Sequence, residues 1–302
     1  MYFYISSKKS SKYFYNYRIC GTSLYSDTGI RELTAFHKGK TLNNIDSSSP
    51  IKQTGDFDLV YNGPGFIADK IREVRLYSRK SQYKLFIKDI ATLIIDYSSE
   101  NKIIYLLQTD TADISLLIEA LLGPALILCL ALDGIFCFHA SAVKYKNKAL
   151  LFIGRSGAGK STLAEYLKNY SEGKIIRLAD DIAPVKMENN IAYIMPHFPQ
   201  LKLPDEKQYP VKSSQKLEIS AIYHLKKDNR RNSIYIKELN STEKALTIIS
   251  NTVASRLFDG SLNKDHIRFS TDLANAVSLN NMVYPHCKVI LNNILNQIIK
   301  KQ

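Results

Sequence analysis

The residues of this chain best suited to chemistry form the segment Gly154-Arg155-Ser156-Gly157-Ala158-Gly159-Lys160-Ser161-Thr162. It contains the complete pattern G-x-x-x-x-G-K-[ST], whose glycines let the backbone curl so that several N–H groups point at one phosphate chain. The ammonium of Lys160 neutralises the outer phosphates, and the hydroxyl of Ser161 is a hard oxygen suited to Mg2+. The segment therefore predicts a loop that binds the phosphates of a nucleotide.

The flanking sequence supplies the elements that such a loop needs. An unbroken apolar run of strand length, Ala149 to Ile153, precedes it. Residues 160–170 read as a helix, whose N-terminal N–H groups favour an anion. A plain glycine turn between strand and helix is the alternative, but it leaves the adjacent Lys160 and Ser161 unexplained.

Two further groups are predicted to lie near the phosphates. Asp180 and Asp181 follow the short apolar strand 174–179, and ligands of open α/β sheets bind at the carboxyl ends of strands. One carboxylate can hold Mg2+ and the other can accept the proton of an attacking hydroxyl; the alternative is that the pair simply begins a turn. His139 lies on the predicted strand 136–145, from which it reaches the same crevice or else packs in the core.

The rest of the C-terminal part is predicted as hairpins and helices. One hairpin joins 185–187 to 191–195, and a second joins 221–225 to 233–239. Asn240 with Glu243 predicts a helix cap ahead of residues 244–257, and further helices are expected at 265–279 and 288–300. Several side chains keep open roles, as site-lining groups or as solvated surface: His197, Gln200, Lys202, Arg256 and Arg268.

The N-terminal part is predicted to be rich in strands, at 13–17, 58–61, 83–87 and 103–107. Turn-forming residues separate them, at 47–50 and at Asn62-Gly63-Pro64-Gly65. Asp113 can cap a helix that begins at Ile114 and kinks near Pro124. We therefore expect an α/β chain with two domains: a smaller β-rich accessory domain over residues 1–112, suited to substrate recognition, and a phosphate-loop domain with a mixed sheet and C-terminal helices over 113–302.

Composition limits the partners and the compartment. The chain has 302 residues, a formal net charge of +13 and four scattered cysteines without a C-x-x-C pair. Its lysines are spread widely, so we expect a solvated basic surface and no nucleic-acid partner. The apolar run 120–132 is shorter than the about 20 residues of a membrane span, which predicts a buried helix and no membrane partner. These features predict a cytoplasmic protein.

Three segments occur in an order that resembles the HPr serine kinase/phosphorylase family: His139-Ala140-Ser141-Ala142-Val143, the Gly154–Ser161 loop and Leu178-Ala179-Asp180-Asp181. Residues 196–203 are similar to a segment of the HPr-kinase-related proteins encoded with lasso-peptide precursors. The resemblance spans roughly residues 114–300. The downstream glycine-rich signature of true HPr kinases, with its metal-binding glutamate, is not recognisable, and this favours the peptide-modifying relatives.

The resemblance implies particular roles for these residues. Lys160 and the loop amides bind ATP, and Ser161 and Asp180 hold Mg2+. Asp181 activates the acceptor hydroxyl, and His139 lines the active site. It also implies a homo-oligomer. We therefore predict an ATP- and Mg2+-dependent kinase that phosphorylates a serine or C-terminal hydroxyl of a peptide or small protein, with a lasso-type precursor peptide as acceptor. The alternatives are a kinase for HPr or free serine, or a nucleotide-gated binding protein without phosphotransfer.

Overall fold

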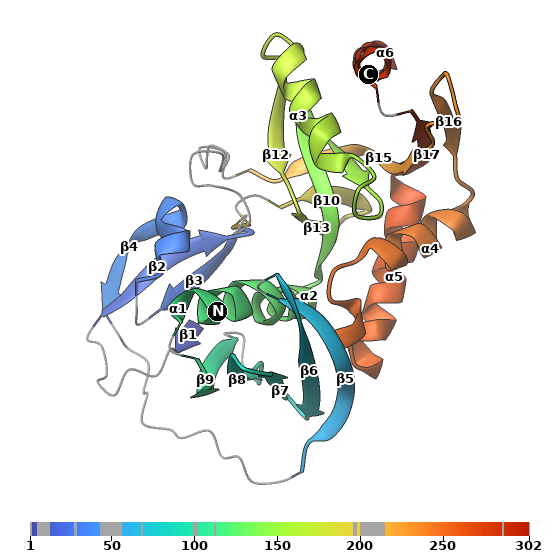
Figure 1. Cartoon of the computed structure of the whole chain (residues 1–302). Helices are drawn as coiled ribbons and strands as arrows, with labels where there is room; N and C mark the ends of the chain where they lie inside the picture. The colour runs from blue at the N-terminus through green and yellow to red at the C-terminus, as the bar shows by residue number, and fades with distance from the viewer. Residues whose placement is uncertain are drawn as a thin grey trace. The chain divides into compact units, whose positions relative to one another are not determined.

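The computed structural model describes residues 2–4, 13–26, 29–42, 56–67, 69–98, 102–111, 113–195, 198–199, 215–285 and 287–301. The chain is mixed α/β and divides into two compact units (Figure 1). One contains Met1–Asp133 with Ala254–Leu262, and the other contains Gly134–Val253 with Asn263–Gln302. Residues 113–133, which the sequence assigned to the C-terminal domain, are thus grouped by their contacts with the N-terminal unit.

The first unit is rich in strands, as expected. Its described strands are β1 (Tyr2–Tyr4), β2 (Tyr13–Ile19), β3 (Thr22–Ser26), β4 (His37–Leu42), β5 (Asp58–Ile67), β6 (Lys70–Arg79), β7 (Gln82–Ile87), β8 (Ala91–Asp96) and β9 (Ile103–Thr109). They form one sheet in the order β4-β2-β3-β1-β9-β8-β7-β6-β5. A short 3-10 helix, η1 (Arg31–Phe36), joins β3 to β4. The β5–β9 part is an antiparallel meander.

The predicted turn at Asn62-Gly63-Pro64-Gly65 is wrong, because these residues lie inside β5 and pair with β6. Among the described strands β5 is at the edge of the sheet, which is where sheets tolerate proline. Gly65 is required for a different reason. A Cβ at this position would lie 2.6 Å from Cγ2 of Val74 across the strand pair.

The predicted kinked helix is confirmed. It consists of α1 (Ile114–Ala120), the π-helical turn η2 (Leu121–Ala125) and α2 (Leu126–Leu132), with non-helical backbone angles at Gly123, just before Pro124. Asp113 caps it by accepting from the Ser115 N–H. The helical stretch Ile114–Leu132 is longer than the apolar run in the sequence and is the one described segment long and apolar enough to cross a membrane. However, 67% of its apolar window is buried inside the protein, which is typical of a core helix.

The second unit is built on a mixed sheet. Its described strands are β10 (Ile135–Tyr145), β11 (Lys148–Ile153), β12 (Ile175–Ala179), β13 (Ile182–Glu188), β14 (Ile191–Ile194), β15 (Leu217–Lys227), β16 (Tyr235–Glu238) and β17 (Ser278–Tyr284). The long strand β10 pairs with β13 through its first half and with β11 and β12 through its second half. Strands β11, β15 and β17 are parallel neighbours, so their carboxyl ends lie at one edge of the sheet.

Helices complete this unit: α3 (Lys160–Tyr170), α4 (Ser241–Asn251), most of α5 (Gly260–Ala276) and α6 (Lys288–Lys301). Apolar side chains of α3 and α6 pack together with those of β11, β15 and β17 in one core. The members of this core on the two helices are Leu163, Ala164, Tyr166, Leu167, Ile290, Leu291, Ile294, Leu295 and Ile298. The helix that follows the phosphate loop is therefore fixed against the sheet and against α6.

Several predicted elements of this unit are confirmed, and three need correction. The strands β10 to β14, the helices α3 and α6 and the capping box of Asn240 with Glu243 lie where they were expected. The second predicted hairpin is wrong, because β17 lies between β15 and β16. The helix expected at 265–279 ends at Ala276, and residues 278–284 form the parallel strand β17 instead. Likewise α4 ends at Asn251, and Ala254, with φ of 59°, ends any helical continuation.

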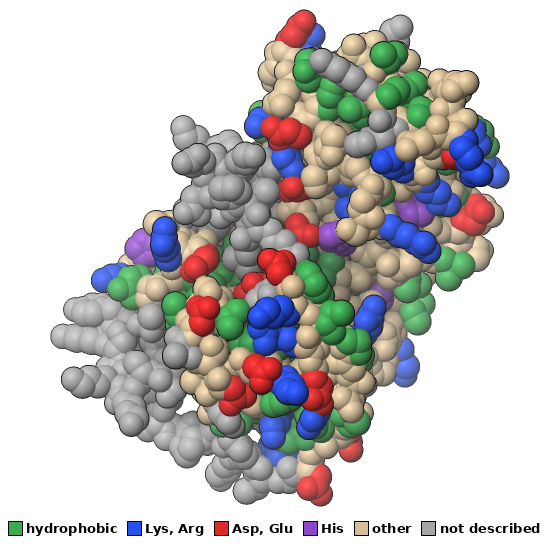
Figure 2. Space-filling view, in the orientation of Figure 1, with side chains coloured by type: hydrophobic (Ala, Val, Ile, Leu, Met, Phe, Trp, Pro, Cys, Tyr) green, Lys and Arg blue, Asp and Glu red, His purple; other side chains and the backbone are tan. Residues whose placement is uncertain are grey.

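Two compositional expectations concern cysteines and charge. All four cysteines are free thiols; Cys20, Cys129 and Cys137 are buried, whereas Cys287 is exposed. On the face drawn in Figure 2, Lys and Arg side chains are interspersed with Asp and Glu side chains. The basic charge on this face is therefore distributed over the surface and not gathered in a single patch.

Candidate active site

The predicted phosphate loop joins β11 to α3 at the carboxyl edge of the parallel strands. Two glycines make its path possible. Gly154 has φ of 139°, and a Cβ there would lie 2.8 Å from the carbonyl oxygen of Leu225 on β15. Gly159 has φ of 92° at the residue that precedes α3. A side chain at either position would displace the loop from the strand or from the helix.

Lys160 and Tyr284 hold the loop from inside. The buried Nζ of Lys160 donates to the carbonyl oxygens of Gly154, at 2.7 Å, and Arg155, at 3.2 Å. Burial lowers the pKa of Lys160, and the charges of Asp181 and Asp180 act in the opposite direction. From the end of β17, the buried hydroxyl of Tyr284 donates to the carbonyl of Ala158 at 3.0 Å. Burial raises the pKa of Tyr284 to about 12, so the phenol keeps its proton.

Asp181 and His139 lie in contact with each other. Asp180 and Asp181 form the tight connection between β12 and β13, and Asp181 has φ of 81°. The N–H of Ala140 donates to the carbonyl of Asp181 at 3.2 Å, which ties the connection to β10. Oδ1 of Asp181 lies 3.0 Å from Nδ1 of the half-exposed His139. The imidazole is thereby oriented by the carboxylate, with both groups accessible to solvent.

Asp180 lies in a more enclosed place than its neighbour. Its side chain is 11% exposed and both of its oxygens are engaged. Oδ1 accepts from the buried Ser141 hydroxyl at 2.5 Å, and Oδ2 pairs with the Arg177 guanidinium. Arg177 also binds Glu165 on α3 at 2.6 Å. The predicted role of Asp180 as a Mg2+ ligand stays a prediction, since its present contacts are those of a residue that positions the turn.

The structure thus gathers some predicted residues and leaves others apart. The loop lysine, Lys160, lies within electrostatic reach of both Asp180 and Asp181. His139 lies beside them because it contacts Asp181. The other loop residues Arg155, Ser156, Ser161 and Thr162 are exposed. Arg268 lies on α5 and Arg256 on the 3-10 turn η4 (Ser255–Leu257) of the first unit. His197, Gln200 and Lys202 lie outside the described residues.

Sequence reasoning missed four polar residues near the loop: Ser141, Arg177, His224 and Tyr284. His224 pairs with Ile153, the residue before the loop, and its Nδ1 lies 2.9 Å from Oδ1 of Asn281 on β17. Burial lowers the pKa of His224, the Asn281 contact opposes this, and the nearby charges of Lys226 and Arg155 lower it further. A polar residue inside an apolar strand is the one feature of the sequence that could have identified Arg177 and His224. It does not predict which residues they contact.

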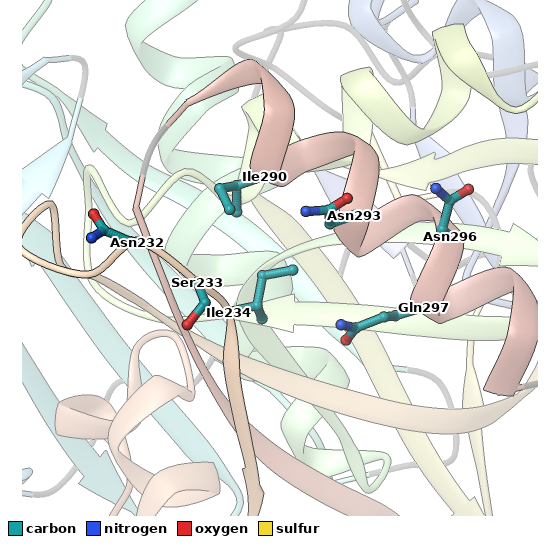
Figure 3. Close-up of a pocket in the computed structure, with 7 residues that line it drawn as sticks. All are labelled: Asn232, Ser233, Ile234, Ile290, Asn293, Asn296 and Gln297. Carbon is teal, nitrogen blue, oxygen red and sulfur yellow. The ribbon is translucent and has the colours of Figure 1, made fainter.

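A pocket of about 370 Å3 opens elsewhere in the second unit, between α6 and the segment before β16 (Figure 3). Its walls are neutral side chains: Asn232, Ser233, Ile234, Ile290, Asn293, Asn296 and Gln297. None of the site residues that the sequence predicted is among the residues that line this pocket. It is a feature of the flank of the sheet, separate from the loop and the carboxylate pair.

The donor set at the loop suits Mg2+. No cluster of three or more His, Cys, Asp or Glu side chains suited to a metal occurs in the described part of the chain. Mg2+ nevertheless needs only one or two protein oxygens, because it keeps several waters and binds the phosphates of the nucleotide. The exposed hydroxyl of Ser161 is an oxygen of this kind. The residues present therefore fit a cation that arrives together with a nucleotide.

No protein-family model matches the sequence, and no curated protein matches it. Among solved structures, the chain is similar to the Hpr(Ser) kinase/phosphatase from Coxiella burnetii. The match has 13% sequence identity and a TM-score of 0.32, and it covers 55% of this chain and 95% of the other.

Proposed function

We propose that this protein is an ATP-dependent kinase that transfers the γ-phosphoryl group to a hydroxyl of a peptide or small protein. One observation supports this above all: the loop lysine, Lys160, lies within electrostatic reach of a solvent-accessible carboxylate, Asp181, that is paired with His139. A phosphate loop alone is compatible with binding. A loop with an accessible, oriented carboxylate beside it has a base for an attacking hydroxyl as well.

In the proposed reaction, the loop amides and Lys160 hold the phosphate chain and neutralise its charge. The acceptor oxygen attacks the γ-phosphorus, the bond to the bridging oxygen of ADP breaks, and Asp181 accepts the hydroxyl proton. Mg2+ held by Ser161, with Asp181 nearby, would supply further charge neutralisation. His139 orients the carboxylate of Asp181 through the 3.0 Å contact.

The acceptor follows from the resemblance in the sequence. We propose a serine or C-terminal hydroxyl of a ribosomal precursor peptide of the lasso type, modified in the cytoplasm. The strand-rich first unit is proposed to recognise that peptide. HPr and free serine are the competing acceptors, and a nucleotide-gated binding protein would bind ATP without transferring phosphate.

Mass spectrometry of candidate acceptors tests the proposal. The protein, ATP and Mg2+ are incubated with HPr, free serine or the precursor peptide encoded beside this gene. We expect phosphate on the peptide alone with the wild type and on nothing with Asp181→Asn. Asparagine tolerates the left-handed backbone of this position, so the variant removes the base without adding strain. Normal transfer by Asp181→Asn would remove the assigned base, and ATP binding without transfer to any acceptor would favour the gated binding protein.

A further inference from the structure

Arg177 joins the helix that follows the phosphate loop to the turn that contains the proposed base. Its Nη1 lies 2.6 Å from Oε2 of Glu165 on α3, and its Nη2 pairs with Oδ2 of Asp180. The Arg177 side chain is 6% exposed. The other oxygen of Asp180 accepts from the Ser141 hydroxyl of β10. One guanidinium therefore spans two elements that are separate along the chain.

The bridge lies beside a β-bulge. Ala179 pairs with Ala142, but the next pair along β10 is Val143 with Arg177, so β12 has one extra residue at Leu178. Asp180 follows β12, in the connection to β13, and there its carboxylate meets the Arg177 guanidinium.

The ionisation of Glu165 strengthens its ion pair with Arg177. Burial raises the pKa of Glu165, but the hydrogen bond and charge of Arg177, together with Lys168 and Asn169, outweigh it, and the net pKa is lowered. Glu165 is thus ionised at neutral pH opposite the guanidinium. A planar guanidinium donates in two fixed directions, which an ammonium cannot do with the same geometry.

We propose that Arg177 is a positioning residue for phosphoryl transfer. By holding Glu165 and Asp180 at once, it sets the Asp180–Asp181 turn relative to α3, and therefore the Asp181 carboxylate relative to the phosphate loop. This proposal rests on the kinase function proposed above. Arg177 acts through Asp180 and Asp181, and reacting atoms are not among its contacts.

Two measurements test the positioning role of Arg177, and the first of them does not require enzymatic activity. The first is hydrogen exchange at the Ala140 amide, which donates to the Asp181 carbonyl and so reports on the turn. The second is the separation of kcat from KM for ATP. In Arg177→Met we expect Ala140 exchange to rise by about 10-fold or more and kcat to fall about 10- to 100-fold, because small misplacements of catalytic groups cost that much. KM for ATP should change by less than about threefold, since Lys160 and the loop amides are unchanged.

Conservative variants and a matched control complete the experiment. Arg177→Lys keeps the charge and should restore part of kcat, and Glu165→Gln should lower kcat less than Arg177→Met. Lys102→Met breaks a comparable part-buried ion pair, with Asp133, in the first unit. It should lower thermal stability and leave both readouts unchanged.

Each outcome has a stated meaning. Unchanged Ala140 exchange in folded Arg177→Met overturns the positioning role, and so does a rise in KM for ATP that matches the fall in kcat. If Arg177→Met does not fold, the two milder variants decide the question. The positioning role is overturned if Arg177→Lys and Glu165→Gln both show the same Ala140 exchange and the same kcat as the wild type. A wild type that transfers no phosphate contradicts the kinase function instead, while the exchange measurement still decides whether Arg177 positions the turn.

Discussion

Replacing Tyr284 by phenylalanine should loosen the phosphate loop without disturbing the core. The Tyr284 hydroxyl donates to the Ala158 carbonyl at 3.0 Å, and the tyrosine side chain is completely buried. Phenylalanine keeps the ring, so no large cavity forms. The change therefore isolates one hydrogen bond between β17 and the loop.

The structure sets the size of the effect. The Ala158 carbonyl is left without its phenol partner in a buried place, and an unsatisfied buried acceptor costs about 1–3 kcal/mol. Part of this cost is relieved if the loop moves away from the sheet, and the loop then no longer directs its amides at one phosphate chain. Since 1.4 kcal/mol is about a tenfold change in an equilibrium constant, we expect ATP affinity to fall by about 10-fold.

Tyr166→Phe is the matched control. The Tyr166 hydroxyl donates to Oδ1 of Asn292 at 2.9 Å and joins α3 to α6. Both variants lose one phenolic hydrogen bond, so both should unfold at a lower urea concentration. Titration of each with ATP should show weaker binding for Tyr284→Phe only. Equal ATP affinities in Tyr284→Phe and the wild type would refute the reasoning, and equal weakening in both variants would show a general loss of stability.

Two further predictions concern the scaffold of the second unit. Burial lowers the pKa of His266 to about 4, below its unfolded value of about 6.5. Between these two pKa values the unfolded chain therefore binds a proton at His266 that the native chain does not. The contribution of the neutral histidine to the free energy of unfolding is fully present above pH 6.5 and is lost as the pH falls towards about 4. The free energy of unfolding should decrease by about 2 kcal/mol between pH 7 and pH 5. Urea unfolding at both pH values should show this slope, and His266→Gln should reduce it; an equal slope in the variant contradicts the assignment. Asn240→Ala removes the capping box of α4 and should cost about 1 kcal/mol, whereas Ser250→Ala, at the other end of α4, should cost less in the same unfolding assay.

The loop, the helix after it and the strand before it could be predicted because the chemistry and the local structure require the same residues. Gly154 and Gly159 are needed for the backbone angles and suit the proposed approach of phosphate, and Lys160 starts a helix whose buried face is largely apolar. The adjacency of β10 and β11 was a natural expectation from their short connection, but the contact of His139 with Asp181 depends on the pairing of β10 with β13, which the sequence does not reveal.

The strand β17 could not be recognised, because its identity depends on tertiary position. Its sequence Ser278-Leu279-Asn280-Asn281-Met282-Val283-Tyr284 contains two asparagines, which are poor strand formers, and it directly follows a helix. It becomes a strand because β15 on one side and β16 on the other satisfy its backbone. The position of β17 beside β15 also determines what Tyr284 and Asn281 contact. It brings Tyr284 to the loop carbonyl of Ala158 and Asn281 to His224.

The same reasoning explains why Asp180 and Asp181, adjacent in sequence, have different surroundings. Asp180 pairs with the buried guanidinium of Arg177, and the left-handed backbone of Asp181 presents the next carboxylate to His139. One carboxylate is thereby paired inside the protein, and the other is accessible within electrostatic reach of Lys160. A carboxylate that accepts a proton must reach the acceptor hydroxyl, and for this reason we propose Asp181 as the base and Asp180 as the residue that holds the turn.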